Sequence, residues 1–173
     1  MTCAICEIFN NKNLFKLIYE DELCVAILHE SPANYGHALV IPKEHYIILE
    51  EVPDDLLMHL FSVSNLISST LFESLNIQGT NILVNNGSDA GQENPHFLIN
   101  VIPRTENDGI NFEWSAKPAS EDDLKTAELK LNQYTKNLIF EKEKPKPLEI
   151  NREPEEINDD EENYMVRSLK KMP

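Results

Sequence analysis

The feature that most constrains the fold is a long amphipathic segment, residues 50–75, which lies between several short apolar runs. Its apolar side chains recur at helical spacing, and they are Leu56, Leu60, Val63, Ile67 and Leu71. Pro53 suits the first turn of a helix, and Asp54 and Asp55 suit the positive end of the helix dipole. One face of this helix is therefore predicted to be buried, against a core or against a partner subunit.

Short strands are predicted on both sides of that helix. They lie within residues 14–28 (two strands around a turn at 20–22), 37–46, 81–87 and 96–104. Antiparallel strands interrupted by one long helix indicate an α+β domain. A second helix is predicted over residues 120–140, where Ser120 caps the first turn and Asp123 follows three residues later.

The composition changes after Phe140. Residues 141–163 contain three prolines, many charges and few apolar side chains, which predicts an extended or disordered acidic linker. In residues 164–173 the side chains of Met165, Leu169 and Met172 are spaced i, i+4 and i+7, a pattern typical of a short amphipathic segment. Two interpretations of that segment stay open: it docks on a protein partner, or it folds back on its own domain.

Charge and cysteine content exclude several classes of function. The net charge of −15 disfavours binding to nucleic acid by the folded part and to anionic membranes. No apolar run approaches the roughly 20 residues needed to span a bilayer, and the first residues lack a signal-peptide pattern, so a cytoplasmic location is expected. Three cysteines argue against a disulfide framework, and Cys24 is predicted to be a small core residue.

Four motifs follow one another along the first 140 residues: CAIC, HESPANYGHALVIPKEHY, NILVNNGSDAGQENPH and IPRTENDGINFEW. In this order they resemble the motifs of histidine-triad (HIT) proteins. The resemblance implies a five-stranded antiparallel half-barrel with one long and one C-terminal helix, usually paired as a homodimer. It also implies a pocket for a nucleoside phosphate. The predicted organisation is a HIT-like domain at 1–140, the linker at 141–163 and the amphipathic segment at 164–173.

The resemblance places the three histidines of the family at His96, Leu98 and Asn100, which share one face of a strand because side chains alternate. In active members the middle histidine attacks the α-phosphorus and forms a covalent nucleotidyl intermediate. Leu98 has no lone pair, so covalent catalysis at this position is excluded. Asn100 donates hydrogen bonds but does not exchange a proton near neutral pH.

Further positions of the nucleotide pocket are implied by the same resemblance, and they are Ile27, His29, His37, Asn85, Gln92 and Glu93. His29 stands where the family uses an aspartate to hold the ribose hydroxyls. Glu93 stands beside the phosphate position, where like charges cost on the order of a few kcal/mol. His37 and Asn85 either line the pocket or serve ordinary packing and turn formation, and both interpretations stay open.

The zinc-bearing branch of the family offers a role for the one remaining triad histidine. In that branch the metal ligands correspond to Cys3, Cys6, His45 and His96 of this sequence. Two thiolates and two imidazoles make a closed tetrahedral site of the structural type, and its metal contributes directly to folding. The alternative is a metal-free relative with fortuitous cysteines.

Together these residues predict a catalytically inactive HIT-family protein with structural zinc, acting as an interaction or nucleotide-sensing module. The alternative is a nucleotide phosphohydrolase or nucleotidyl transferase with a non-standard site, in which water attacks and Glu93 is the base. The expected partners are a second copy of the chain, a protein bound through Tyr164–Pro173 and the acidic linker, and a weakly bound nucleotide.

Overall fold

The computed structural model describes residues 3–10 and 15–136. The described residues fall into two units, one up to Ile110 and the other from Asn111 onward. The predicted linker at 141–163 and the segment at 164–173 lie outside the described residues. Within the described ranges, no helix has the length and apolar character needed to cross a membrane.

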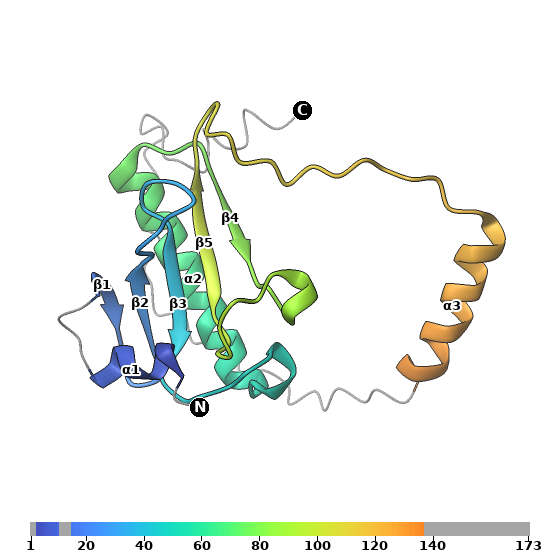
Figure 1. The fold of residues 1–173 in the computed structure, drawn as a ribbon, viewed down its shortest axis with the longest axis horizontal. Helices are drawn as coiled ribbons and strands as arrows, with labels where there is room; N and C mark the ends of the chain where they lie inside the picture. Colours follow the sequence, from blue (N-terminus) through green and yellow to red (C-terminus); the bar gives the residue numbers. More distant parts are fainter. Residues whose placement is uncertain (1–2, 11–14, 137–173) are drawn as a thin grey trace, which may run out of the picture. The chain divides into compact units, whose positions relative to one another are not determined.

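The first unit is built on an antiparallel five-stranded sheet with the strand order β1-β2-β3-β5-β4 (Figure 1). The strands are β1 (Leu17–Glu20), β2 (Cys24–Leu28), β3 (Ala38–Pro42), β4 (Gly79–Leu83) and β5 (Ile99–Arg104). Helix α1 (Ala4–Asn10) precedes the sheet, and α2 (Asp54–Leu75) connects β3 to β4. Two short 3-10 turns lie at Leu49–Glu51 and Ser88–Ala90. This arrangement confirms the predicted α+β fold.

Helix α2 covers one face of the sheet, behind β3 and β5 in Figure 1. It begins after Pro53 and ends at Leu75, and the capping residue Asn76 has a left-handed φ of 51°, which asparagine tolerates well. Its buried residues are Leu60, Val63, Ser64, Ile67, Ser68 and Leu71. Leu56, the remaining predicted member of the apolar face, is partly buried and packs against the core. The helical spacing in the sequence therefore identified the buried face.

The sheet is buried on both faces, which is why β3 reads as a continuous apolar run. Ala38 and Val40 join the core cluster under α2, whereas Leu39 and Ile41 join a second cluster that includes Ile5 of α1. Successive side chains of a strand point to opposite faces, so one short strand supplies both clusters. Helix α1 thus packs on the face opposite α2.

Two predicted strand boundaries are wrong. Strand β4 begins at Gly79 and ends at Leu83, earlier in the chain than predicted, because its register pairs Gly79 with Arg104. Strand β5 begins at Ile99 and not at His96. The backbone N–H of Phe97 donates to the carbonyl of Tyr46 at 2.6 Å, so this stretch leaves the ladder with β3. His96 and Leu98 therefore lie just before the strand.

The second unit contains helix α3 (Glu121–Thr135), and its described residues are exposed. The Ser120 hydroxyl accepts a hydrogen bond from the backbone N–H of Asp123 at 3.1 Å, as the capping pattern predicts. The predicted helix extended to residue 140, and residues 137–140 lie outside the described range.

Candidate metal centre and adjacent pocket

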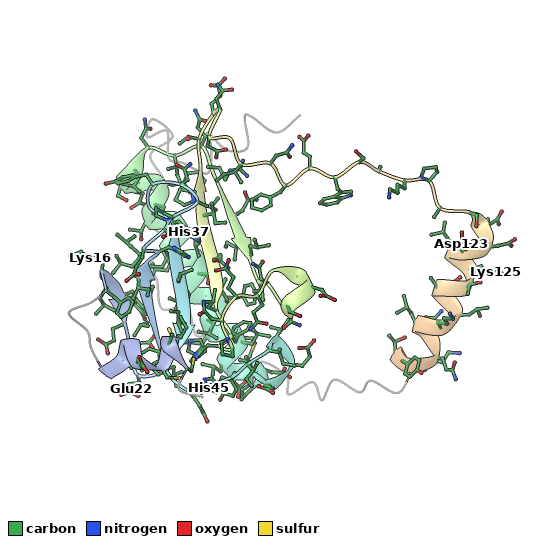
Figure 2. All side chains as sticks on the ribbon, in the orientation of Figure 1. Lys16, Glu22, His37, His45, Asp123 and Lys125 are labelled. Atoms are coloured by element: carbon green, nitrogen blue, oxygen red, sulfur yellow. The ribbon has the colours of Figure 1, made fainter. Side chains whose placement is uncertain are left out.

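Four side chains from three distant parts of the sequence converge at one end of the sheet. Cys3 and Cys6 come from the start of α1, His45 follows β3, and His96 precedes β5. One donor atom of each residue lies within 4.8 Å of the others. Figure 2 shows His45 at the end of the domain where α1 lies. The structure therefore brings together all the residues that the sequence predicts as metal ligands.

The distances between donor atoms can be compared with a tetrahedral site. The Sγ of Cys6 lies 3.2 Å from Nδ1 of His45 and 3.5 Å from Nδ1 of His96. The Sγ of Cys3 lies 3.6 Å from Nδ1 of His96, and the two histidine Nδ1 atoms are 3.2 Å apart. Bond lengths of about 2.0–2.3 Å around zinc give tetrahedral edges of roughly 3.3–3.8 Å. The spacing and the donor set therefore fit zinc.

The environment of His96 prepares it to act as a ligand. Its Nε2 lies 3.1 Å from the carbonyl oxygen of Pro42, and because a carbonyl only accepts, Nε2 carries the proton. The lone pair of Nδ1 is left facing the two cysteines. Burial lowers the pKa of His96; the Pro42 bond opposes this shift and the nearby His45 reinforces it. A neutral imidazole is the form that binds a metal ion.

The two cysteines are close enough to disfavour a double negative charge. Burial raises the pKa of Cys6, and the hydrogen bond and charge of Cys3 raise it further. A bound cation reverses this situation, because a coordinated thiol is deprotonated. The pair is therefore suited to a metal ion that neutralises both sulfurs.

Beside this cluster lies a pocket of about 180 Å³. It is lined by His29, Leu39, Asn85, Gly91, Gln92, Glu93, Asn94, His96, Leu98 and Asn100. The three positions predicted to correspond to the family's histidines, His96, Leu98 and Asn100, thus line one pocket, although only Asn100 belongs to β5. Of the predicted pocket residues, Ile27 and His37 are not in this lining. Ile27 instead packs in the core cluster under α1.

Leu98, which is predicted to stand at the middle triad position, brings an alkyl side chain to the pocket. It is partly buried and packs against the cluster that contains Leu39 and Ile41. The side chain thus extends the core into the floor of the pocket. The atom that this position offers to a ligand is carbon, which neither attacks phosphorus nor carries a proton.

Asn100 is held by the protein at both ends of its amide. Its Oδ1 lies 3.1 Å from Nε2 of His37, and its Nδ2 donates to the carbonyl of Leu83 at 3.3 Å. Since Nδ1 of His37 accepts from the backbone N–H of Ala33 at 3.2 Å, Nε2 of His37 is the protonated nitrogen. His37 is therefore a positioning residue for Asn100, located behind the pocket wall.

His29 and His37 stack with ring centroids 4.7 Å apart. Nδ1 of His29 accepts from the backbone N–H of Ser31 at 3.0 Å, which leaves Nε2–H as the donor of the neutral ring. Burial lowers the pKa of His37, the nearby His29 lowers it further, and the bond to Asn100 opposes both. The buried ring of this pair is thus kept neutral.

Polar residues of the pocket rim also shape the loop between β4 and β5. Gln92 donates to the carbonyls of Ile47 at 2.7 Å and Asn94 at 2.9 Å, and its Oε1 accepts from the N–H of Gly87. Asn85 donates to the carbonyl of Gly91 at 3.1 Å. The exposed Glu93 lies on the same rim. Asn85 therefore serves both roles considered from the sequence, because it organises the loop and lines the pocket.

One polar cluster that is not predicted from the sequence ties the β1–β2 turn to α2. The Oδ2 atom of Asp21 lies 2.7 Å from Nε2 of His59 and accepts from the hydroxyl of Tyr19 at 2.8 Å. Cys24 is fully buried, as predicted, and its thiol donates to Asp21 at 3.6 Å. No spacing rule relates a turn residue to a helix residue 38 positions later.

Comparison with known proteins agrees with the fold and the cluster. The HIT domain family model matches residues 11–107, and the chain therefore belongs to the HIT domain family. Adenylylsulfatase HINT3 of Arabidopsis thaliana is 35% identical over 137 residues, which cover 79% of this chain and 66% of that protein.

Two solved structures are similar to the fold. A zinc-bound histidine triad family protein from Mycobacterium smegmatis aligns with a TM-score of 0.61 and 31% identity, over 79% of this chain and 97% of that one. A histidine triad nucleotide-binding protein from Candida albicans aligns with a TM-score of 0.70 and 27% identity, over 78% of this chain and 98% of that one. A zinc-bound protein is thus among the structural neighbours.

Proposed function

We propose that this chain is a non-catalytic HIT protein, in which a structural zinc site supports an interaction or nucleotide-sensing module. The observation that carries the proposal is Leu98, which lines the pocket between His96 and Asn100. An alkyl group at the position of the nucleophile leaves the pocket without the atom that would bond to phosphorus.

The neighbouring residues support the same conclusion. The amide of Asn100 is committed to His37 and Leu83, so it is fixed in place and does not exchange protons. Glu93 adds a carboxylate to the rim, where a bound phosphate would meet a like charge. Affinity for an uncharged nucleoside is therefore expected to exceed affinity for its monophosphate.

Structural zinc is proposed on the geometry of Cys3, Cys6, His45 and His96. When bound, the ion supplies Lewis-acid bonds that hold α1 against the strands. The chain itself supplies the orientation of His96, through the bond from Nε2–H to Pro42. The protein supplies all four ligands of this site. That arrangement is typical of a structural zinc site, because a catalytic zinc site keeps one ligand position open for water or substrate.

Turnover is the direct test of inactivity. Purified protein, zinc-replete, is incubated with adenosine phosphoramidate and with a dinucleoside polyphosphate, and products are separated by chromatography. We expect no turnover above a buffer control and no nucleotide adduct by intact-protein mass spectrometry. The matched variant Leu98→His with Asn100→His restores the missing imidazoles and is expected to gain a detectable adduct. Turnover by the wild-type protein that persists in a second, independent preparation would contradict the proposal.

The alternative function is a hydrolase in which water attacks and Glu93 acts as the base. The similarity to a protein named adenylylsulfatase keeps this class in consideration. Glu93→Gln removes the base while preserving shape, so any wild-type activity of this kind is expected to fall by roughly 10²-fold or more. Unchanged rates in Glu93→Gln would dismiss this mechanism.

Three kinds of binding partner are proposed for this chain: a nucleotide, a second copy of the chain and another protein. Calorimetry with adenosine and with AMP at millimolar concentration tests the sensing role, and the absence of heat from both would leave only the interaction role. Sedimentation of the full chain tests the proposed homodimer. Capture experiments that compare the full chain with one lacking residues 141–173 test the proposed protein partner of Tyr164–Pro173.

A further inference from the structure

An apolar groove lies on the opposite side of the sheet from the metal cluster. It has a volume of about 340 Å³ and runs between the β1–β2 edge and the second half of α2. Ile18, Leu28 and Tyr35 form one wall, and Leu66, Leu71 and Leu75 form the other. Tyr35, Leu66 and Ile18 are 79%, 50% and 43% exposed. A groove with this much accessible apolar surface favours an apolar occupant.

The polar atoms of the helical wall do not compete for such an occupant. The hydroxyl of Thr70 donates to the carbonyl of Leu66 at 2.9 Å, and the hydroxyl of Ser74 donates to the carbonyl of Thr70. Each hydroxyl is thus satisfied within α2. The groove therefore presents mainly hydrocarbon, and an amphipathic helix is a common ligand for this kind of surface.

We propose that residues 164–173 of the same chain occupy this groove. Met165, Leu169 and Met172 would lie on one helical face, as their spacing of i, i+4 and i+7 indicates. Ten helical residues extend about 15 Å. The helical wall from Leu66 to Leu75 has the same number of residues and therefore the same length.

Charge also favours this occupant. Residues 164–173 contain three basic residues and no acidic one, in a chain with a net charge of −15. Glu30 is exposed on the loop after β2, and Glu73 is exposed on α2, each close in sequence to residues that line the groove. Lys16 is an exposed cation just before β1. The net positive charge of the segment would therefore be attracted toward the acidic groups beside the groove, which favours the encounter at low ionic strength.

The connection is long enough for docking within one chain. The 27 residues at 137–163 span at most about 90 Å when extended, and a flexible chain of that length covers roughly 30 Å on average. Docking within one chain is therefore an intramolecular event, whose extent does not depend on protein concentration. The protein partner proposed for Tyr164–Pro173 would therefore have to compete with the groove for this segment.

Photo-crosslinking tests the contact in the full chain. Benzophenone-alanine replaces Leu169, and mass spectrometry locates the cross-link after irradiation. We expect cross-links within one chain, to peptides covering residues 15–36 or 61–75, with a yield independent of protein concentration. The same probe at Leu148 is the matched control and is expected to give at least fivefold less cross-linking to those peptides. Cross-links that join two copies, or that fall outside the groove peptides, would overturn the proposal.

Hydrogen exchange provides a second, reciprocal measurement. Leu169→Asp in the segment and Leu66→Asp in the groove are each expected to speed exchange at β1 and at residues 66–75 at least threefold. The matched controls carry the same change at Leu148 in the linker and at the exposed Leu129 of α3. Equal exchange rates in Leu169→Asp and Leu148→Asp would refute docking. Circular dichroism establishes that the variants remain folded.

Discussion

At the scale of single residues, His96, Leu98 and Asn100 line one pocket but make different contacts with the rest of the domain. Asn100 keeps a hydrogen bond to His37 and another to Leu83, so it supports the pocket wall. Leu98 joins an apolar cluster, which makes it a packing residue. His96 retains an imidazole whose Nδ1 faces two thiols. Each of the three side chains is thus fixed by contacts within the domain.

The buried ring of His37 predicts a pH dependence of stability. Its folded pKa lies below the ordinary value of 6.5, so the unfolded chain takes up a proton that the folded protein does not. The free energy of unfolding therefore falls as pH decreases through the unfolded pKa, by at most about 1.4 kcal/mol per pH unit for one proton, and levels off below the folded pKa.

His37→Gln removes this titration. Urea unfolding from pH 7.5 to 5.0 is expected to show a shallower loss of stability in His37→Gln than in the wild-type protein. The histidines outside the stacked pair of His29 and His37 keep their surroundings in both proteins, so the difference reports on this pair. Parallel stability profiles for the two proteins would show that the ring is not held neutral.

At the scale of secondary-structure elements, Asp21 links the β1–β2 turn to α2. Partial burial raises the pKa of this carboxyl group, but hydrogen bonds from the N–H of Cys24, from His59, from the N–H of Leu23 and from Tyr19 outweigh it. The resulting pKa lies well below its usual range. The ionised carboxylate thus joins a turn, a strand and a helix through hydrogen bonds.

Asp21→Asn is expected to lower the free energy of unfolding by about 1–3 kcal/mol at pH 7. The folded pKa of this carboxyl group lies below the unfolded value, which is near 3.9. The ionised carboxylate therefore stabilises the fold at higher pH, and this stabilisation is lost as pH falls toward the folded pKa. The difference between wild type and variant should therefore shrink below about pH 4. Urea unfolding of the wild-type protein and the variant, at pH 7 and again below about pH 4, measures this difference in the free energy of unfolding. Asp122→Asn, on the exposed α3, is the matched control, and a similar loss there would contradict the assignment.

At the scale of the whole domain, the cluster of Cys3, Cys6, His45 and His96 adjoins the α1 face of the core. Ile5 packs with Val25, Ile27, Leu39 and Ile41, and Cys3 borders the same cluster. Helix α1 has seven residues, and helices of this length are marginal in water without tertiary support. Zinc bonds at Cys3 and Cys6 would fix that helix against the sheet.

Cys6→Ser is therefore expected to lose zinc and to release α1. Elemental analysis should give about one zinc per wild-type chain and at least tenfold less in the variant. Hydrogen exchange over residues 3–10 should accelerate, while exchange in α2 changes less. Cys24→Ala, which removes the buried thiol outside the cluster, serves as the control and should retain its zinc. Equal zinc content in Cys6→Ser and the wild type would exclude the site.

The sequence by itself determined the α+β class, the buried face of α2, the cap of α3 and the identity of the clustered residues, because helical periodicity, capping and family motifs are local patterns. Tertiary structure alone decided where β5 begins, since the Phe97 N–H bonds to Tyr46 instead of β3. It also decided that His37 supports Asn100 and that His59 meets Asp21. These contacts join residues 63 and 38 positions apart, and such pairings follow from how the sheet and helix pack, which no short window of sequence specifies.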